Sequence, residues 1–499
     1  MMSVLSAMID LLTSPVNLFF MFLGTTLGIL VGAIPGMSGS MAIALLIPIT
    51  YVMDPIIAFS MIAGIYNGSI FGGAISAIML KIPGTGAAVA TVWDGYEMTK
   101  HGEAGRALEV ACSGSAFGGI FSVMCLALLA PPLSKVALMF GPSEYFWAAF
   151  LGLTLMITLA SNNMIKGLSA GAFGIWLATI GLDPLTATSR FTFGQMHLLG
   201  GIPLVPFLIG LFALPQSFEL LQKSRQKITI IENDNQKNKK YRLFGEFKEL
   251  WKTYIKSSII GTIVGIIPAA GGNIGALVSY TEAKRTSKHS ESFGTGISEG
   301  VLAAETANNA VTGGALVPLL TLGVPGSVAS AIMVGAFLVH GMEVGPMLFI
   351  KHPRVVNDFI AALLITNIMM LFIGYYFSKP IAKIAEVPNN ILAPIIIMVC
   401  VIGTYSMRNY FFDVALLIIF GVIGYYLKRY NFPLGPIVLG FILGPIAETN
   451  FLRALTIGQG NLLILFKGPI SLLLLSVSIL SIIGPIYKQK QTIKNYRRC

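Results

Sequence analysis

The sequence GILVGAIPGMSGS at residues 28–40 breaks a long apolar run with glycine, proline and serine, and a second copy, GTIVGIIPAAGGN, stands at residues 261–273. A proline inside a helix cannot donate its backbone N–H and clashes with the preceding turn, whereas glycine tolerates unwound backbone. We therefore expect helices to stop at Pro35 and Pro268. In lipid, the backbone groups freed by a break need protein, water or ligand as partners, so paired breaks are typical of a binding site.

A second motif follows each copy of the first in the same order. It combines an asparagine, a glycine pair and a Pro-Gly-hydroxyl tripeptide. The first motif repeats at an offset of 233 residues and the second at 241 to 242, which indicates an internal duplication. The two copies of the second motif are Asn67, Gly72, Gly73 and Pro83-Gly84-Thr85, and then Asn308, Gly313, Gly314 and Pro325-Gly326-Ser327.

The composition is that of a membrane protein. Apolar residues make up 55% of the chain and charged residues 11%, and the mean hydropathy is +0.78. Apolar runs of about 20 residues, enough to cross a bilayer, recur along the chain. We expect an all-α polytopic membrane protein with about a dozen transmembrane or re-entrant helical passages, some of them broken. The unbroken candidates are 14–34, 107–130, 144–160, 165–182, 199–221, 328–349, 358–377, 388–404, 410–427 and 468–487.

The net charge of +11 lies in two segments. Residues 222–256 hold ten Lys and Arg against four acids, and residues 488–499 hold five against none. Because basic residues in short flanking segments mark the cytoplasmic side, we expect both segments in the cytoplasm and no nucleic-acid partner. The predicted organisation is a first membrane half (1–221), a basic linker (222–256), a second half with further helices (257–487) and a basic tail (488–499).

Equivalent loops of the two halves differ in charge. Lys284, Arg285 and Lys288 follow the second copy of the first motif, whereas residues 51–54 after the first copy hold no base. This favours inverted repeats, with a parallel duplication as the alternative. The end of the linker, FGEFKELWKTYIKS at residues 244–257, predicts either an amphipathic helix on the inner membrane surface or a cytoplasmic connector helix.

Each break exposes free N–H groups at one helix end and free carbonyls at the other, which suit carboxylates and small cations respectively. Hydroxyls after the Pro-Gly pairs also suit a carboxylate, although ordinary turns with Ser or Thr as N-caps are the alternative. Lys81 either attracts an anion or extends to the membrane surface. The candidate substrate residues are Pro35, Gly36, Ser38, Gly39, Ser40, Lys81, Pro83, Gly84, Thr85, Gly271, Gly272, Asn273, Pro325, Gly326 and Ser327.

A second set of residues predicts a cation site. Glu305 and Asn308 are three residues apart on one helical face within an apolar segment, where ionisable groups are costly. The alternatives are a structural salt bridge for Glu305 and interhelical hydrogen bonds for the asparagines. The candidate cation-coupling residues are Asn67, Glu305, Asn308, Asn309, Gly313 and Gly314.

Several motifs are absent from the sequence. It has no G-x4-GK[ST] phosphate loop, no HExxH and no ligand cluster of Cys and His, so we expect neither an enzyme, nor a cofactor, nor a metal beyond Na⁺. Energy then comes from an ion gradient, with Na⁺ or H⁺ as the coupling ion. The four cysteines, Cys112, Cys125, Cys400 and Cys499, show no paired spacing and are expected to be packing residues.

Five segments together resemble one family, the large membrane subunit of the bacterial tripartite tricarboxylate transporters. They are GILVGAIPGMSGS, AGIYNGSIFGGAISAIMLKIPGTGAAVATVWDGYEM, GIIPAAGGN, FGTGISEGVLAAETANNAVTGGALVPLLTLGVPGS and HGMEVGPMLF. The resemblance runs from about Gly24 to Phe349, and the C-terminal third fits by length and hydropathy only. Lys81 departs from it, because an uncharged polar residue is expected there.

The resemblance implies a multi-pass permease subunit of the bacterial cytoplasmic membrane. It implies two partners, a small membrane subunit and a periplasmic solute-binding protein, and import of citrate or related carboxylates with Na⁺ or H⁺. The alternatives from the residues alone are an ion channel or pore subunit, and a structural membrane scaffold. The family's motifs fall on Gly28, Gly32, Pro35 and Gly36, on Pro83, Gly84 and Thr85, and on Asn308, Asn309, Gly313 and Gly314, with Pro268, Gly271 and Gly272 as repeat counterparts.

The predicted topology is testable by thiol labelling. In a variant without native cysteines, Asn235→Cys and Gln491→Cys should react with impermeant reagents only after the inner membrane is opened, because both lie in basic segments. Labelling of either position in intact cells would overturn the orientation.

Overall fold

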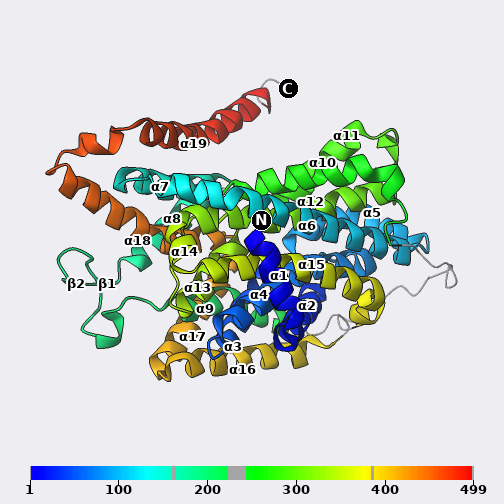
Figure 1. Ribbon diagram of the computed structural model, residues 1–499, viewed down its shortest axis with the longest axis horizontal. Coiled ribbons are helices and arrows are strands. Elements are labelled where there is room, and N and C mark those ends of the chain that lie inside the picture. Colours follow the sequence, from blue (N-terminus) through cyan, green and yellow to red (C-terminus); the bar gives the residue numbers. More distant parts are fainter. Residues whose placement is uncertain (1, 160–163, 223–242, 269, 384–386, 497–499) are drawn as a thin grey trace.

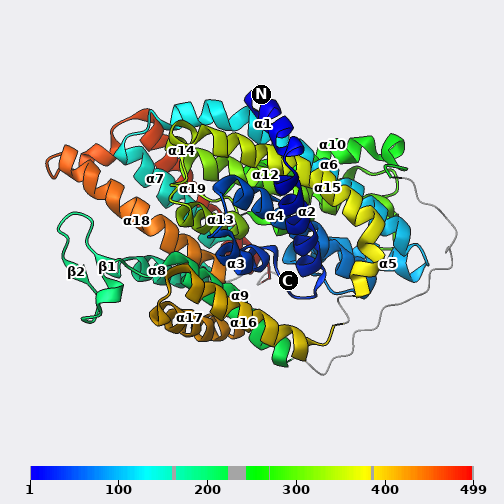
Figure 2. The same cartoon turned by 60° about the horizontal axis from the view of Figure 1, so that its bottom comes forward.

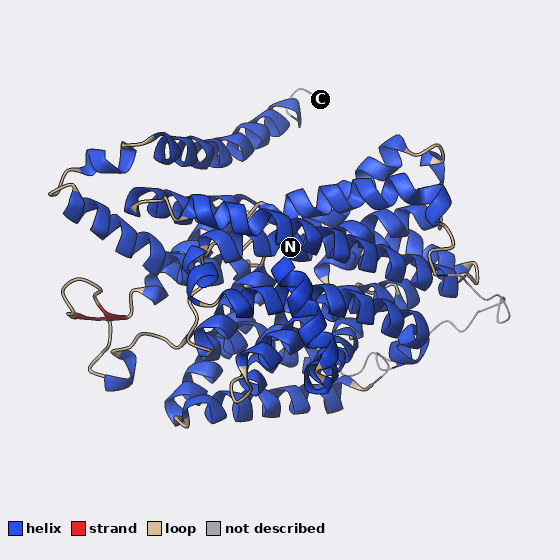
Figure 3. Ribbon diagram, in the orientation of Figure 1, coloured by secondary structure: helices blue, strands red, loops and turns tan. Residues whose placement is uncertain are grey.

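The computed structural model describes residues 2–159, 164–222, 243–268, 270–383 and 387–496. These residues are almost wholly helical (Figure 3). The described strands form one antiparallel hairpin, in which β1 (Gly181–Leu182) pairs with β2 (Ser189–Arg190). Eight of the described helices are long and apolar enough to cross a membrane. The fold is therefore the predicted all-α polytopic membrane protein.

The first half of the chain holds nine α-helices, and the rest of the chain holds ten. The first set is α1 (Met2–Thr13), α2 (Pro15–Ala33), α3 (Gly39–Thr50), α4 (Pro55–Leu80), η1 (Gly86–Ala88), α5 (Val89–Lys100), α6 (Ala104–Ala137), α7 (Pro142–Leu159), α8 (Met164–Ala178), η2 (Met196–Leu198) and α9 (Leu204–Gln222). The second set is α10 (Phe247–Ile266), α11 (Gly271–Thr286), η3 (Ser290–Ser292), α12 (Ser298–Leu322), α13 (Val328–Val339), α14 (Pro346–Lys351), α15 (Pro353–Ala382), α16 (Asn389–Arg408), α17 (Phe411–Arg429), α18 (Leu434–Ile457), η5 (Leu462–Phe466) and α19 (Pro469–Tyr496).

The predicted helix breaks occur in both halves. Helix α2 ends at Ala33, just before Pro35, and α10 ends at Ile266, just before Pro268. The chain then restarts as α3 and α11. At the second motif, α4 and α12 end on residues in the left-handed region, Lys81 and Gly323, before the next helical segment begins. The duplicated unit is thus a pair of broken helices in each half.

Glycines hold each broken pair together at very short range. A β-carbon at Gly72 would lie 2.4 Å from the carbonyl oxygen of Ile29, and one at Gly314 would lie 2.5 Å from that of Thr262. Ile29 and Thr262 are 233 residues apart, as the first motif requires, and Gly72 and Gly314 are 242 apart. The counterpart of Gly72 is therefore Gly314, and the match to Gly313 at an offset of 241 is wrong.

The two halves interlock rather than lie side by side. Helix α4 packs on α15, and α12 packs on α6, so each broken helix contacts the other half. The starts of the short helices also cross over, because α3 contacts α13 and α11 contacts η1. Figures 1 and 2 both place α4 and α12 in the interior of the molecule. Most of α4 and α12 is buried in protein, which suits backbone irregularity at their ends.

Two sequence predictions need correction. The apolar run 328–349 is not one helix, because α13 ends at Val339 and the chain turns through Gly341 and Gly345, both at positive φ. The segment 244–257 is neither a surface helix nor a separate connector. Most of it is the first part of α10, and its Tyr254 is buried and hydrogen-bonds to Ser113 at 2.8 Å. The structure thus continues a helix across the predicted linker boundary at residue 256.

Three of the four cysteines behave as predicted. Cys112, Cys125 and Cys400 are unpaired thiols, and two of them are buried. Cys499 lies outside the described residues.

The glycine contacts make a stability prediction. In Gly72→Ala the added methyl meets backbone that cannot move independently, so we expect a loss of about 1–3 kcal/mol of stability and a lower melting temperature. The matched control is Gly200→Ala, because no atom lies within 4 Å of a β-carbon there. Equal melting temperatures for the two variants in detergent would contradict the predicted close packing.

Candidate functional site

The starts of four helical segments, α3, η1, α11 and α13, surround one interior cavity of about 320 Å³. These are the segments that follow the four breaks. The cavity therefore lies where the duplicated motifs converge. Its lining residues are Ser38, Gly39, Ser40, Tyr66, Ile70, Thr85, Gly86, Ala87, Ala270, Gly271, Gly272, Asn273, Ile274, Asn308, Val311, Thr312, Ser327, Val328, Ala329, Pro433 and Gly435.

Most of the lining consists of equivalent pairs from the two halves. Residues of the first motif pair at an offset of 233 and residues of the second at 242. The cavity is therefore built with approximate twofold equivalence. The pairs are Ser38 and Gly271, Gly39 and Gly272, Ser40 and Asn273, Tyr66 and Asn308, Ile70 and Thr312, Thr85 and Ser327, Gly86 and Val328, and Ala87 and Ala329.

Eight of the predicted substrate residues line the cavity, and six others stand immediately beside it in sequence. The six include Gly84 and Gly326, which press against the backbone of the broken helices. Their N–H groups donate to the carbonyls of Gly73 and Ala315, each at 3.3 Å. The eight are Ser38, Gly39, Ser40, Thr85, Gly271, Gly272, Asn273 and Ser327, and the six are Pro35, Gly36, Pro83, Gly84, Pro325 and Gly326.

Lys81 is not at the cavity. It ends α4 in the left-handed region, is exposed, and places its ammonium 5.4 Å from the centre of the Tyr96 ring. It lines a separate surface hollow with Trp93 and Lys284. The site described here therefore does not include this lysine.

The N-cap alternative holds for two of the hydroxyls. Ser38 accepts the N–H of Met41 at 3.1 Å, and Ser327 forms a reciprocal capping box with Ser330. Thr85 is different, because it caps nothing and its buried hydroxyl has no hydrogen-bond partner among the described residues. Helix α11 likewise has no side-chain cap in the described part of the chain. The cavity thus holds polar groups that the protein itself does not satisfy.

No charged side chain lines this cavity in the described residues. Its polarity comes from hydroxyls, amides and the starts of α3, α11 and α13, each of which is at least 12 residues long. The N-terminal end of a helix carries about half a positive elementary charge and exposes free N–H groups. The cavity is therefore suited to a small anion.

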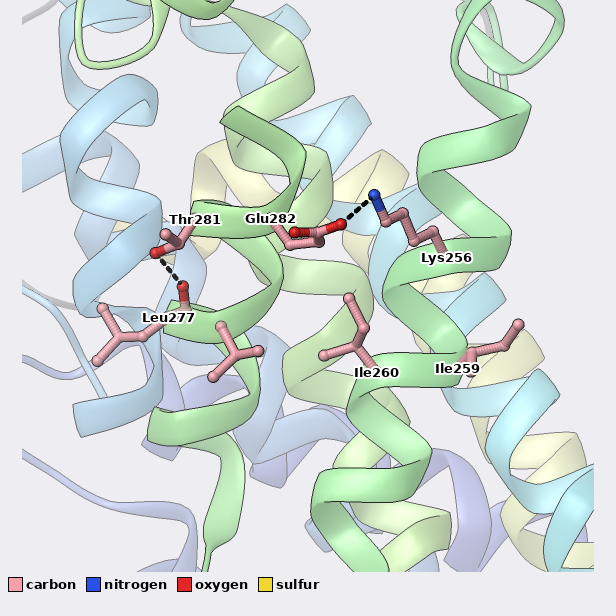
Figure 4. A pocket seen from close by; sticks show the side chains of 7 residues that line it. Lys256, Ile259, Ile260, Leu277, Thr281 and Glu282 are labelled. Atoms are coloured by element: carbon pink, nitrogen blue, oxygen red, sulfur yellow. Dashed lines mark hydrogen bonds and ion pairs between the residues drawn. The ribbon is translucent and has the colours of Figure 1, made fainter. Parts of the chain in front are cut away.

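A larger hollow of about 640 Å³ lies between α10 and α11 (Figure 4). Its lining is apolar apart from Thr281 and the pair Lys256 and Glu282, whose charged atoms are 2.6 Å apart. The two charges neutralise each other, and Thr281 donates to a carbonyl of its own helix. This hollow leaves no polar group free for a ligand, so it is not the better candidate.

Next to the cavity, Glu305 is a fully buried carboxylate. It accepts hydrogen bonds from the hydroxyls of Thr91 and of Ser115, the latter at 3.3 Å, and no basic group of the described chain pairs with it. Asn308 lies close to this carboxylate without forming a hydrogen bond, and its amide has no partner among the described residues. Since Asn308 also lines the cavity, it connects the two places.

The other predicted cation residues have structural partners. Asn67 donates to the hydroxyl of Thr366 at 2.9 Å, and Asn309 donates to that of Ser115 at 2.8 Å. These are the same interhelical contact in each half, at an offset of 242, so the counterpart of Asn67 is Asn309 and not Asn308. Gly313 accommodates Ser122, to which its N–H donates at 3.3 Å, and Gly314 packs on Thr262.

Comparison with known proteins adds the family. The family model described as "Tripartite tricarboxylate transporter TctA family" matches residues 18–439. The chain belongs to this family. It is therefore a multi-pass membrane subunit of the tricarboxylate-transporter type.

Two relatives from Agrobacterium vitis are similar to this TctA-family chain. One is described as an uncharacterized 52.8 kDa protein in the TAR-I ttuC' 3' region, and it is 36% identical over 471 residues, which cover 94% of this chain and 93% of the relative. The other is an uncharacterized protein in the TAR-II ttuC' 3' region, 34% identical over 223 residues, which cover 45% of this chain and 92% of the relative.

Some residues of the TctA-family site escaped the sequence analysis. Tyr66 precedes Asn67 directly, and the correct offset of 242 would have paired it with Asn308. Thr91 and Ser115 gave no signal, because single hydroxyls in apolar helices are common and usually bond to their own helix. Asp94, noted only as a charge in an apolar context, is buried and accepts the N–H groups of Gly294, Gly296 and Ile297 and the hydroxyl of Tyr280.

The unpartnered hydroxyl makes a sharp functional prediction. Thr85→Val should weaken transport about ten- to hundredfold, because a hydrogen bond to a charged ligand contributes about 1.5–3 kcal/mol, while stability stays unchanged. Ser327→Ala should weaken transport similarly and also lose about 1 kcal/mol of stability with its cap.

Matched controls are Thr321→Val and Ser217→Ala, whose buried hydroxyls bond only to their own helices. Uptake rates and melting temperatures of all four variants should be compared. Parental uptake by both cavity variants would place the site elsewhere.

Proposed function

We propose that this TctA-family chain is the permease subunit of a binding-protein-dependent secondary transporter that imports tricarboxylates (citrate-like) or related carboxylates. The observation that carries this proposal is the convergence of all four breaks on one uncharged interior cavity. Helix starts and hydroxyls are the groups that bind carboxylates without a basic side chain. The interlocked halves support alternation around this site, with inverted repeats as the arrangement we favour.

The same charges argue for a coupling cation. Three helix starts supply roughly 1.5 positive elementary charges, which does not neutralise a substrate of charge −2 or −3. A co-transported Na⁺ or H⁺ offsets the deficit and supplies energy from its gradient. We place this ion at Glu305, because a buried carboxylate without a basic partner is stabilised by a bound cation or proton.

The partners we propose are a small membrane subunit and a periplasmic solute-binding protein, with the bacterial cytoplasmic membrane as the location. The word "tripartite" in the family description supports a complex of this kind. The basic linker and tail place both segments in the cytoplasm. The site would then receive carboxylate from the binding protein on the opposite side.

Reconstitution with both partners tests the coupling. Uptake into proteoliposomes should saturate, require an inward Na⁺ or H⁺ gradient, and ignore ATP. Glu305→Gln should abolish gradient-driven accumulation, since the amide cannot hold the cation charge, whereas Glu97→Gln, an exposed acid paired with Lys100, should transport normally.

Two results would contradict the proposal. Undiminished accumulation after both gradients collapse would exclude ion coupling. Flux that does not saturate and needs no binding protein would indicate a channel instead.

A further inference from the structure

The cavity divides into two subsites, each built from both halves of the chain. Helix α3 contacts α13, and α11 contacts η1. Each subsite therefore combines the first break of one half with the second break of the other. The approximate equivalence of the halves then gives the two subsites similar chemistry.

The first subsite lies at the starts of α3 and α13. It presents the hydroxyls of Ser38 and Ser40, which are 2.9 Å apart, and that of Ser327. Each hydroxyl lies at the first residues of a 12-residue helix, where the backbone N–H groups are free. The combination suits one carboxylate.

The second subsite lies where α11 meets η1. A β-carbon at Gly86 would lie 2.9 Å from Nδ2 of Asn273, so the Asn273 amide reaches the segment that carries Thr85. Thr85 is 6% exposed and Asn308 is 1% exposed, and both line the cavity. Neither the Thr85 hydroxyl nor the Asn308 amide has a hydrogen-bond partner among the described residues. Buried polar groups without partners are costly, so these groups point to a ligand.

We infer that the substrate is a small dicarboxylate, with one carboxylate in each subsite. The inference rests on the proposed carboxylate function and narrows it to a class. Two subsites with a helix start and hydroxyl or amide donors match two carboxylates, and the remaining lining residues offer no third group of this kind. The three helix starts supply roughly 1.5 positive charges, which is closer to two negative charges than to three. A volume of about 320 Å³ is at the lower end for ligand cavities and suits a short molecule.

The two ends of the cavity are not identical. Tyr66 and Ile70 of the first half stand where Asn308 and Thr312 stand in the second. The side of the cavity next to α12 is therefore the more polar one. A hydroxyl carried by the substrate between its carboxylates is expected to face Asn308 and Thr312.

Binding to the full chain in lipid nanodiscs, with Na⁺ present at neutral pH, tests this class. The probes are succinate, L-malate and L-tartrate, succinamate as the matched analogue with one carboxylate replaced by an amide, and citrate. We expect at least one dicarboxylate to bind, and succinamate and citrate each to bind roughly ten- to hundredfold more weakly than the best dicarboxylate.

Variants assign the two ends. Thr85→Val and Ser327→Ala should each weaken binding of the best dicarboxylate by about tenfold or more, whereas the controls Thr321→Val and Ser217→Ala should not. Binding of citrate or succinamate as tight as that of the best dicarboxylate would overturn the dicarboxylate inference and leave a carboxylate permease standing. Absence of binding and of transport for every carboxylate would overturn the proposed function as well.

Discussion

The structure depends on one constraint, which is that backbone N–H and C=O groups inside a membrane protein need partners. Pro35 and Pro268 end two helices in the interior, so their freed groups and the following helix starts must face protein or ligand. Close glycine contacts, such as Gly72 on Ile29 and Gly314 on Thr262, bring the broken helices together around these ends. The interlocking of the two halves then encloses the ends in one cavity.

The same constraint explains why the site has no charged lining. A lysine in an interior cavity would need a counter-ion in the absence of substrate, whereas a helix start carries partial charge at no such cost. Lys81 accordingly lies outside, against Tyr96. The one buried acid nearby, Glu305, is held by the hydroxyls of Thr91 and Ser115, and its lack of a basic partner sets it apart from Asp94, which accepts four hydrogen bonds.

Much of the candidate site was predictable because equivalent residues in two copies reinforce each other. Thr85 and Ser327 follow the two Pro-Gly pairs, and both line the cavity. The register of the second motif was not predictable, because adjacent asparagines at 308 and 309 allow offsets of 241 and 242. Successive residues of a helix point about 100° apart, so this single residue separates an amide in the cavity from one in a helix contact.

The sequence by itself determined the class of protein, the duplication and the positions of the breaks. These follow from hydropathy and from the covalent limits of proline and glycine, which act wherever the residues stand in the chain. Tertiary structure alone decided that the first break of each half meets the second break of the other, that Lys81 is excluded, and that Thr91 and Ser115 hold Glu305. These are contacts between segments far apart in sequence, and only the packing of the interlocked helices fixes which distant residues meet.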